Sequence, residues 1–191
     1  MSEKSNRGPI LIGLARAAIA EKLDVEYKPA KPELQNWLKD EAASFVTLTK
    51  DGQLRGCIGT LEAYRPLIED LRANAVAAAF QDPRFSALTA YEFDLVQIEV
   101  SVLSELESMH AKSEEIAISK LIPQRDGVVL KYGSHRATFL PQVWKQLPDP
   151  KDFLAHLKQK AGLAADFWHP EVLLYKYQVS KYRETATSET V

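Results

Sequence analysis

Apolar side chains recur at helical spacing in two stretches of the first half of the chain. Between residues 9 and 22 every third or fourth position is apolar, and the pattern returns in LIEDLRANAVAAAF, residues 67–80. Such a stripe is typical of a helix that packs one face against a core. The sequence therefore predicts two core-packing helices. Between them, the two prolines of YKPAKP indicate a connection into a short helix at residues 33–39.

Alternation of apolar and polar positions predicts the strands. SFVTLTKDGQLRGCIGTLEAY, residues 44–64, predicts a hairpin, because two alternating runs flank the turn residues KDGQ. LVQIEVSVLS, residues 95–104, predicts a strand with one fully apolar face. A second hairpin is predicted at residues 127–140, turning near Gly133, and a closing strand at residues 172–179.

Two further helices are indicated by their end signals. Ser113, followed by two glutamates, begins a helix of about two turns, since acidic residues favour a helix N-terminus. Asp149 as N-cap, Pro150 at the first helical position and Gly162 after the last turn mark the other. Helices mixed with hairpins, without regular βαβ alternation, predict an α+β fold with a mainly antiparallel sheet and flanking helices.

Composition narrows the class of protein. The chain has 191 residues, 46% of them hydrophobic, a formal net charge of -2 and one cysteine. These values are typical of a single folded domain, 1–191, with a frayed tail at residues 185–191. The N-terminus has no leader pattern or membrane span, so a cytoplasmic protein without a membrane partner is expected. The charge leaves nucleic acid open as a partner but gives it no support.

The segment LRGCIGT, residues 54–60, contains the single cysteine. Alternation puts Arg55, Cys57 and Gly59 on one face of the predicted strand. A guanidinium beside a thiol stabilises the thiolate, as a nucleophilic cysteine requires, and the missing side chain at Gly59 leaves room for a ligand or another backbone. The same pattern also fits a small residue in a tight strand, since free cysteine is among the most buried residue types.

Other segments carry further candidates. Asp82 and Arg84 belong to the turn DPRF after the second helix, which could present functional side chains or be an ordinary turn with a surface ion pair. Glu99 and Ser101 lie on the mixed face of their strand, where a carboxylate needs a partner such as Arg55 or Arg84. The four histidines have no metal-ligand spacing, so neither a metal nor a cofactor is predicted.

Five segments, in order, resemble the AMMECR protein family: LRGCIGT, AAAFQDPRFSAL, IEVSVLS, ATFLPQVW and FLAHLKQKAGL. LRGCIG is the signature of that family, and KQLPDPKDF departs from its pattern in a connection. The resemblance implies one domain of two unequal α+β subdomains with a cleft between them. The larger is expected at about residues 8–107 and 166–184, and the smaller at about 108–165.

The resemblance implies no settled activity, because the molecular function of the family is unresolved, so enzymatic activity is left open. In microbes the domain accompanies Memo-type and radical-SAM proteins. This implies a cytoplasmic ligand-binding or accessory module of a modification pathway, with RNA as a suggested substrate. An unidentified small molecule or nucleotide is expected in a cleft around the LRGCIG strand. The candidate ligand-binding residues are Arg55, Gly56, Gly59, Thr60, Asp82, Arg84, Glu99 and Ser101.

Two alternatives stay open at this point. The first is a thiol-dependent enzyme in which Cys57 is the catalytic nucleophile, with Arg55 stabilising the thiolate and His135 as a candidate base. The second is a protein-interaction adaptor that uses an exposed apolar patch.

Overall fold

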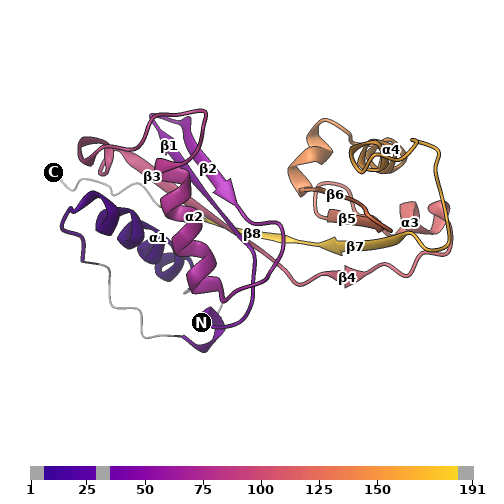
Figure 1. Cartoon of the computed structure of the whole chain (residues 1–191), viewed down its shortest axis with the longest axis horizontal. Coiled ribbons are helices and arrows are strands. Elements are labelled where there is room, and N and C mark those ends of the chain that lie inside the picture. Colours follow the sequence, from indigo (N-terminus) through magenta and orange to yellow (C-terminus); the bar gives the residue numbers. More distant parts are fainter. Residues whose placement is uncertain (1–6, 29–34, 185–191) are drawn as a thin grey trace. The chain divides into compact units, whose positions relative to one another are not determined.

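A computed structural model describes residues 7–28 and 35–184 (Figure 1). It is an α+β structure with antiparallel pairing, as the sequence predicted, and its strands form two sheets. The chain divides into two compact units: a first unit of the residues up to Leu103 and from Ser180 onward, and a second unit of residues 104–179. Each unit has one four-stranded sheet and its own hydrophobic core. The bounds predicted for two subdomains, and the cleft between them, stay predictions.

The sheet of the first unit has the strand order β2-β1-β3-β8. Its strands are β1 (Ser44–Lys50), β2 (Gln53–Gly59), β3 (Val96–Leu103) and β8 (Val179–Arg183). The turn between β1 and β2 has positive φ at Asp51 (51°) and Gly52 (74°), the backbone that two-residue hairpin turns favour. The predicted hairpin is therefore confirmed.

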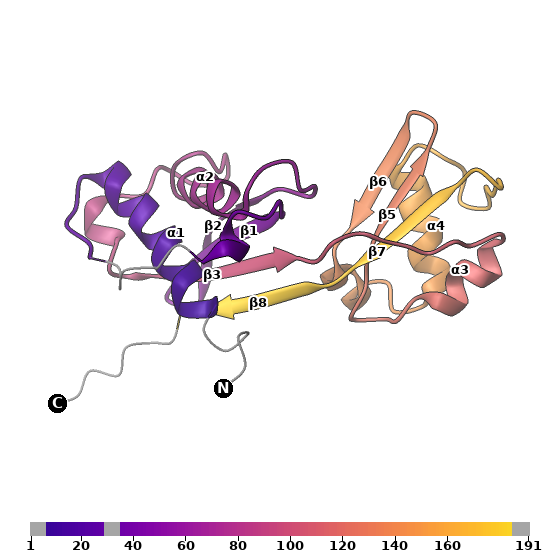
Figure 2. The ribbon, with the colours of Figure 1, turned by 90° about the horizontal axis from the view of Figure 1, so that it is seen from below.

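Two helices cover one face of this sheet. They are α1 (Arg7–Leu23) and α2 (Leu67–Phe80), which Figures 1 and 2 show side by side. The alternate positions of β1 and β3 that face them are buried at 2% exposure or less; these are Val46, Leu48, Ile98 and Val100. The 3₁₀ helices η2 (Asn36–Leu38) and η3 (Ala90–Glu92) lie in the connections. η2 replaces the predicted short helix, and the first two residues of that prediction lie outside the described ones.

The sheet of the second unit has the order β4-β7-β5-β6. Its strands are β4 (Glu107–Ser108), β5 (Gly127–Tyr132), β6 (His135–Phe139) and β7 (Leu173–Tyr177). Its core packs against α3 (Glu114–Lys120), η4 (Pro141–Lys145) and α4 (Pro150–Lys160).

Both predicted N-caps are confirmed. The Ser113 side chain accepts a hydrogen bond from the Ile116 N–H, and the Asp149 carboxylate accepts from the N–H groups of Lys151 and Asp152. These bonds satisfy donors that the first turn of a helix leaves without an intrahelical partner. The sequence therefore marked where α3 and α4 begin.

The closing strand predicted at residues 172–179 is confirmed as β7, which is shorter than predicted. The chain continues into β8, which begins at Val179 and belongs to the other sheet. Between them the Gln178 N–H donates to the Ser104 Oγ (2.9 Å) and the Ser104 N–H donates to the Gln178 carbonyl (2.8 Å). A side-chain oxygen thus replaces a backbone acceptor at this point, which alternation alone does not indicate.

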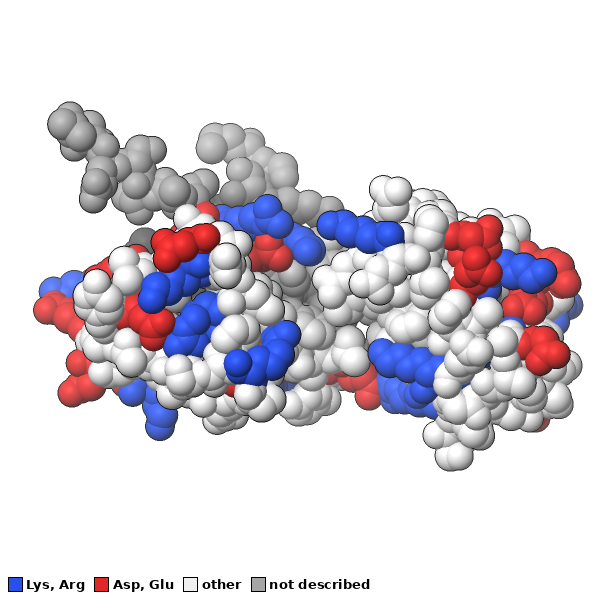
Figure 3. Space-filling model, turned by 90° about the horizontal axis from the view of Figure 1, so that it is seen from above, with Lys and Arg blue, Asp and Glu red and all other residues white. Residues whose placement is uncertain are grey.

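The surface carries both signs of charge. On the face shown in Figure 3, Lys and Arg side chains lie among Asp and Glu side chains on each unit. This agrees with the small formal net charge. Within the described residues, no helix combines the length and apolar character needed to cross a bilayer.

Candidate functional site

The turn DPRF covers the outer edge of β2, the edge strand of the first sheet. The Cys57 N–H donates to Asp82 Oδ2 (2.9 Å), and Arg84 Nη2 approaches the Cys57 carbonyl at 3.4 Å. Arg84 also pairs with both carboxylate oxygens of Asp82, at 2.9 Å from Nε and 2.7 Å from Nη2. The loop therefore satisfies backbone groups that an edge strand would otherwise expose. The structure thus brings Cys57, Asp82 and Arg84 together.

Asp82 and Arg84 differ in exposure. Asp82 is 4% exposed, whereas the Arg84 side chain is 55% exposed. The hydrogen bond from Arg84, and after it the bond from the Cys57 N–H, hold the pKa of the Asp82 carboxyl well below its usual range. The same pairing raises the pKa of Arg84. Arg84 Nη1 has no hydrogen-bond partner in the described parts of the chain. The charged guanidinium of Arg84 is therefore held in place by Asp82, and its Nη1 is available to donate a hydrogen bond.

The Cys57 thiol is half-buried and contacts a hydroxyl. Its Sγ lies 3.2 Å from Oγ1 of Thr47, which faces it from β1. Over residues 7–28 and 35–184, this is the one side-chain hydrogen bond of the sulfur. His135, the candidate base, lies in the second unit, where its Nδ1 is 2.8 Å from the Ala161 carbonyl.

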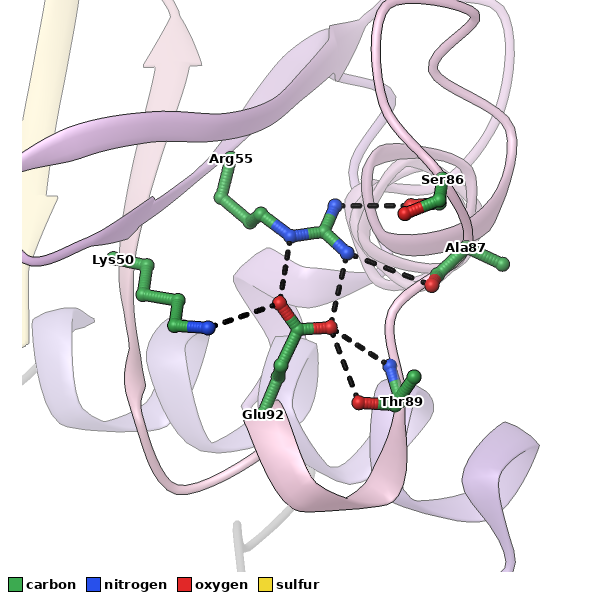
Figure 4. Close-up of polar contacts among 6 residues, drawn as sticks. All are labelled: Lys50, Arg55, Ser86, Ala87, Thr89 and Glu92. Carbon is green, nitrogen blue, oxygen red and sulfur yellow. Dashed lines mark hydrogen bonds and ion pairs between the residues drawn. The ribbon is translucent and has the colours of Figure 1, made fainter.

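Arg55 pairs with Glu92 and not with the Cys57 side chain, which corrects the pairing expected from alternation. Its Nε and Nη2 each lie 3.0 Å from a different oxygen of Glu92, and its Nη1 donates to the Ser86 carbonyl at 3.0 Å (Figure 4). The side chain is only 12% exposed. Arg55 therefore ties the connection before β3 to β2.

A bulge explains why alternation misplaced Arg55. Leu48 pairs with Gly56 but Thr49 pairs with Leu54, so Arg55 is an extra residue opposite β1. Its bond to Glu92 lowers the pKa of that carboxyl to about 2.

The two glycines of the signature allow close packing rather than leaving space. A Cβ at Gly56 would lie 2.1 Å from the Ala78 carbonyl oxygen, so this glycine lets α2 approach β2. A Cβ at Gly59 would lie 2.2 Å from the Phe45 ring. The room expected over Gly59 is therefore filled by a side chain of the neighbouring strand, and that expectation is wrong.

Glu99 has cationic partners other than the predicted ones. It pairs with Lys181 (3.5 Å) and with Arg183, both on β8, not with Arg55 or Arg84. Ser101, 8% exposed, lies opposite Phe45. Since Thr47 pairs with both Cys57 and Glu99, the three residues form one row across the sheet.

Thr60 belongs to a polar network that sequence reasoning missed. Its hydroxyl donates to Asp70 Oδ1 (2.7 Å) and accepts from Asn74 Nδ2 (3.0 Å). Asp70 is fully buried and also accepts from the Ser44 hydroxyl (2.6 Å) and from Arg65 Nε (2.9 Å). A signal was present, because Asp70 and Asn74 are four residues apart beside the apolar stripe of α2, where buried polar groups must be paired.

The fold and the site define the class of protein. It is an α+β protein of two sheet-containing units, with a cysteine on the edge strand of the first sheet and an Asp-Arg pair beside it. The chain belongs to the AMMECR1 family, whose family model matches residues 12–182. This confirms the family predicted from the five sequence segments.

Archaeal proteins are similar over nearly the whole chain. A protein of Thermofilum pendens is 36% identical, covering 95% of this chain and 91% of its own length. One of Methanocaldococcus jannaschii is also 36% identical, covering 93% and 90%. The crystal structure of the uncharacterized protein PH0010 from Pyrococcus horikoshii matches with a TM-score of 0.73 at 34% identity, covering 93% of this chain and 91% of that one. These similarities establish the family and the fold.

Proposed function

We propose that the protein is a ligand-binding or accessory module that holds an anionic group at Arg84, beside Cys57. The observation that carries this proposal is the half-exposed Arg84 guanidinium, oriented by the buried Asp82 carboxylate, whose Nη1 is available. Asp82 is itself fixed by the Cys57 N–H. Holding the guanidinium in place before the ligand arrives reduces the entropy lost on binding.

The chemistry of the pair indicates the class of ligand. A guanidinium recognises carboxylate and phosphate through directed N–H groups. Since Asp82 offsets one positive charge, neighbouring donors must contribute to recognition, and the Thr47 hydroxyl and the Cys57 thiol, 3.2 Å apart, are the donors that the proposal uses. A phosphate or carboxylate of a small molecule or nucleotide fits this arrangement, whereas Arg55 is excluded as its anchor by its bonds to Glu92.

The family resemblance gives this proposal a setting. Memo-type and radical-SAM proteins are the proposed partners, in a cytoplasmic modification pathway for which the family resemblance suggests RNA as the substrate. In that setting this chain would hold the anionic part of a substrate while another chain performs the reaction.

Thermal unfolding with added ligands tests the proposal. Inorganic phosphate, nucleotides and short RNAs are titrated against the natural chain, Arg84→Ala and the control Arg72→Ala. Arg72 is also a partly exposed arginine paired with a carboxylate, that of Glu21, but it lies on α2. We expect at least one ligand to raise the melting temperature of the natural chain and of the control but not of Arg84→Ala. An equal rise in all three chains, or none in any, would refute the proposed anchor.

The thiol-dependent alternative makes a different prediction, which alkylation of Cys57 by iodoacetamide measures. A catalytic thiolate reacts at its full rate already at neutral pH. The contact of Sγ with a hydroxyl rather than a base supports the binding module, for which we expect the rate to keep rising through the alkaline range. A plateau at neutral pH would favour the enzyme.

A further inference from the structure

The sheet of the first unit has a second face, which is turned away from α1 and α2. Since side chains alternate along a strand, it carries the positions of β1 and β3 between those that pack against the helices. In register, these positions are Phe45, Thr47, Thr49, Gln97, Glu99 and Ser101. Glu99 is the one charged residue among these six. This face is therefore mainly polar and neutral along β1 and β3.

Two cations of β8 converge on Glu99 at one edge of this face. Lys181 Nζ lies 3.5 Å from one oxygen of the carboxylate, and Arg183 Nε donates a hydrogen bond to the other. The Glu99 side chain is 17% exposed, whereas those of Lys181 and Arg183 are 49% and 75% exposed. The carboxylate therefore lies deeper than the two cations that it orients, and the three groups together carry one net positive charge.

Arg84 lies at the opposite edge of the sheet, beside β2. Its Nη2 approaches the Cys57 carbonyl at 3.4 Å, and the Cys57 thiol points to the same face as Thr47. The hydrogen bond with Asp82 is the main cause that raises the pKa of Arg84, and the charge of Cys57 adds to it, so the guanidinium and the sulfur are electrostatic neighbours. Both edges thus share one design, in which a more buried carboxylate orients a more exposed cation.

A single row of residues connects the two edges. Thr47 pairs with Cys57 on one side and with Glu99 on the other, and β8 lies beside β3 (Figure 2). Neighbouring strands are about 4.8 Å apart, so the two outer strands of this four-stranded sheet are separated by about 14 Å. One phosphate or carboxylate is too small to reach both edges, whereas a longer molecule with an anionic group at each end can.

We propose that the protein binds an elongated small molecule with two anionic groups, one held by Arg84 and the other by Lys181 and Arg183. The middle of the molecule lies across Thr47 and Cys57. This inference rests on the proposed function, because Arg84 is the anchor in both. Guanidinium and ammonium groups both bind phosphate and carboxylate. Once one end is held, the second end binds at a high effective concentration, which raises the affinity.

The charge of the two edges favours a small dianion over nucleic acid. Arg84 and Asp82 together carry no net charge, and the group at Glu99 carries one positive charge. The whole chain has a formal net charge of -2. Surfaces that bind nucleic acid usually have a larger basic excess, because they neutralise many phosphates at once.

Calorimetric titration of the full chain with synthetic bisphosphates tests the proposal. The two phosphates are joined by oligoethylene glycol spacers of increasing length, and the phosphate monoesters of the same spacers are titrated beside them. The variants are Arg84→Gln and the double variant Lys181→Gln with Arg183→Gln. The control, Arg72→Gln with Lys28→Gln, also removes two cations of the first unit that are paired with carboxylates.

We expect the natural chain and the control to bind bisphosphates that span about 14 Å at least about 10-fold more tightly than the monoesters or the shortest bisphosphate. The variant at Lys181 and Arg183 should lose this gain and keep the binding of the monoesters, whereas Arg84→Gln should weaken both. An equal loss of the gain in the control would show a general effect of charge and would overturn the proposal.

The same titrations distinguish the two proposals. If Arg84→Gln weakens binding of the monoesters but affinity does not depend on spacer length, the anchor at Arg84 stands and the elongated dianion is refuted. If no probe binds, or if Arg84→Gln changes nothing, both proposals fail. A single-stranded RNA of about ten nucleotides that binds more tightly than every bisphosphate, through the same cations, would assign the face to nucleic acid and overturn the small molecule.

Glu99→Gln separates orientation from simple attraction. Removing a carboxylate from a surface that attracts anions only by its charge raises its affinity for them. If Glu99 orients Lys181 and Arg183, its loss releases both side chains, and we expect weaker binding of the long bisphosphates. Tighter binding to this variant would overturn the role of Glu99 and the site built on it.

Discussion

At the scale of single residues, Arg55 and Arg84 show how differently two arginines near one cysteine can act. Arg55 is two positions from Cys57 in sequence, yet its guanidinium is occupied by Glu92 and by backbone carbonyls. Arg84 is distant in sequence, yet it lies beside the Cys57 backbone and is half-exposed. Closeness to Cys57 along the strand therefore did not identify the arginine whose guanidinium is available. A guanidinium binds the acceptors that offer it the strongest hydrogen bonds, wherever they lie in the sequence.

The pair of Arg55 and Glu92 gives an acid-sensitive contribution to stability. The pKa of Glu92 falls from its ordinary 4.5 to about 2, chiefly because Arg55 donates hydrogen bonds to it. A carboxyl whose pKa is lower in the folded than in the unfolded state stabilises the fold fully above the unfolded value, and this stabilisation is lost as pH falls from about 4.5 towards about 2.

Glu92→Gln removes this titration. Urea unfolding in pH steps across the window should give a difference in unfolding free energy between the natural chain and the variant that shrinks as pH falls. Glu105→Gln, at an exposed glutamate that makes no ion pair within the described residues, is the control and should show a small, constant difference. A difference for Glu92→Gln that does not change with pH would contradict the role of the pair.

The packing of Phe45 over Gly59 gives a second prediction for single residues. Gly59→Ala introduces a Cβ 2.2 Å from the ring, and such overpacking costs about 1 to 3 kcal/mol. In a Phe45→Ala background the same change should cost much less, because the ring is gone. A double-mutant cycle by urea unfolding should give a coupling above about 0.5 kcal/mol, whereas additive effects would show that the ring moves aside.

At the scale of elements, β2 is an edge strand covered by a turn rather than by another strand. The bulge at Arg55 and the turn DPRF both restrict pairing at this edge, which protects the sheet from adding a further strand. The same turn positions Arg84. One local element therefore serves both the stability of the sheet and the proposed binding of an anion.

The N-cap of α4 offers a prediction for an element of the second unit. The Asp149 carboxylate accepts from two N–H groups of the first turn. Asp149→Ala should lower the free energy of unfolding by about 1 kcal/mol, whereas Asp149→Asn, which keeps an acceptor oxygen, should lower it by less. Thermal and urea unfolding check this ranking, and equal losses for the two variants would contradict a capping role.

At the scale of the whole molecule, the first unit is discontinuous in sequence and the second is continuous. Residues from Ser180 onward return to the first unit, where Glu184 pairs with the buried Arg16 (2.6 Å) and accepts from the Ile98 N–H (3.1 Å). In the second unit, the two ends meet through the bonds between Ser104 and Gln178. The first unit therefore needs the segment that follows the second unit in order to fold, whereas the second unit is made of one continuous segment.

We expect residues 104–179 to fold as a separate fragment, because they contain their own core and their ends are already joined by hydrogen bonds. Residues 1–103 alone should not give a cooperative transition, since they lack β8 and the partner of Arg16. Circular dichroism and thermal unfolding of the two fragments check both expectations. An unfolded 104–179 fragment would show that its core depends on the first unit.

The sequence by itself determined the helices α1, α2, α3 and α4 and both hairpins. These follow from short-range rules: the periodicity of apolar side chains, caps and turn residues act within a few positions of one another. The sequence also determined the family, through the resemblance of five segments. It also supplied Cys57, Asp82 and Arg84 as candidates, but only the tertiary structure decided which of the candidates lie together. The partners of Arg55, Glu99 and Thr60, the Phe45 ring over Gly59 and the assignment of β7 and β8 to different sheets all depend on contacts between segments distant in sequence. Alternation fixes the face of a regular strand, but a bulge or a better acceptor elsewhere in the fold decides where a charged side chain finally binds.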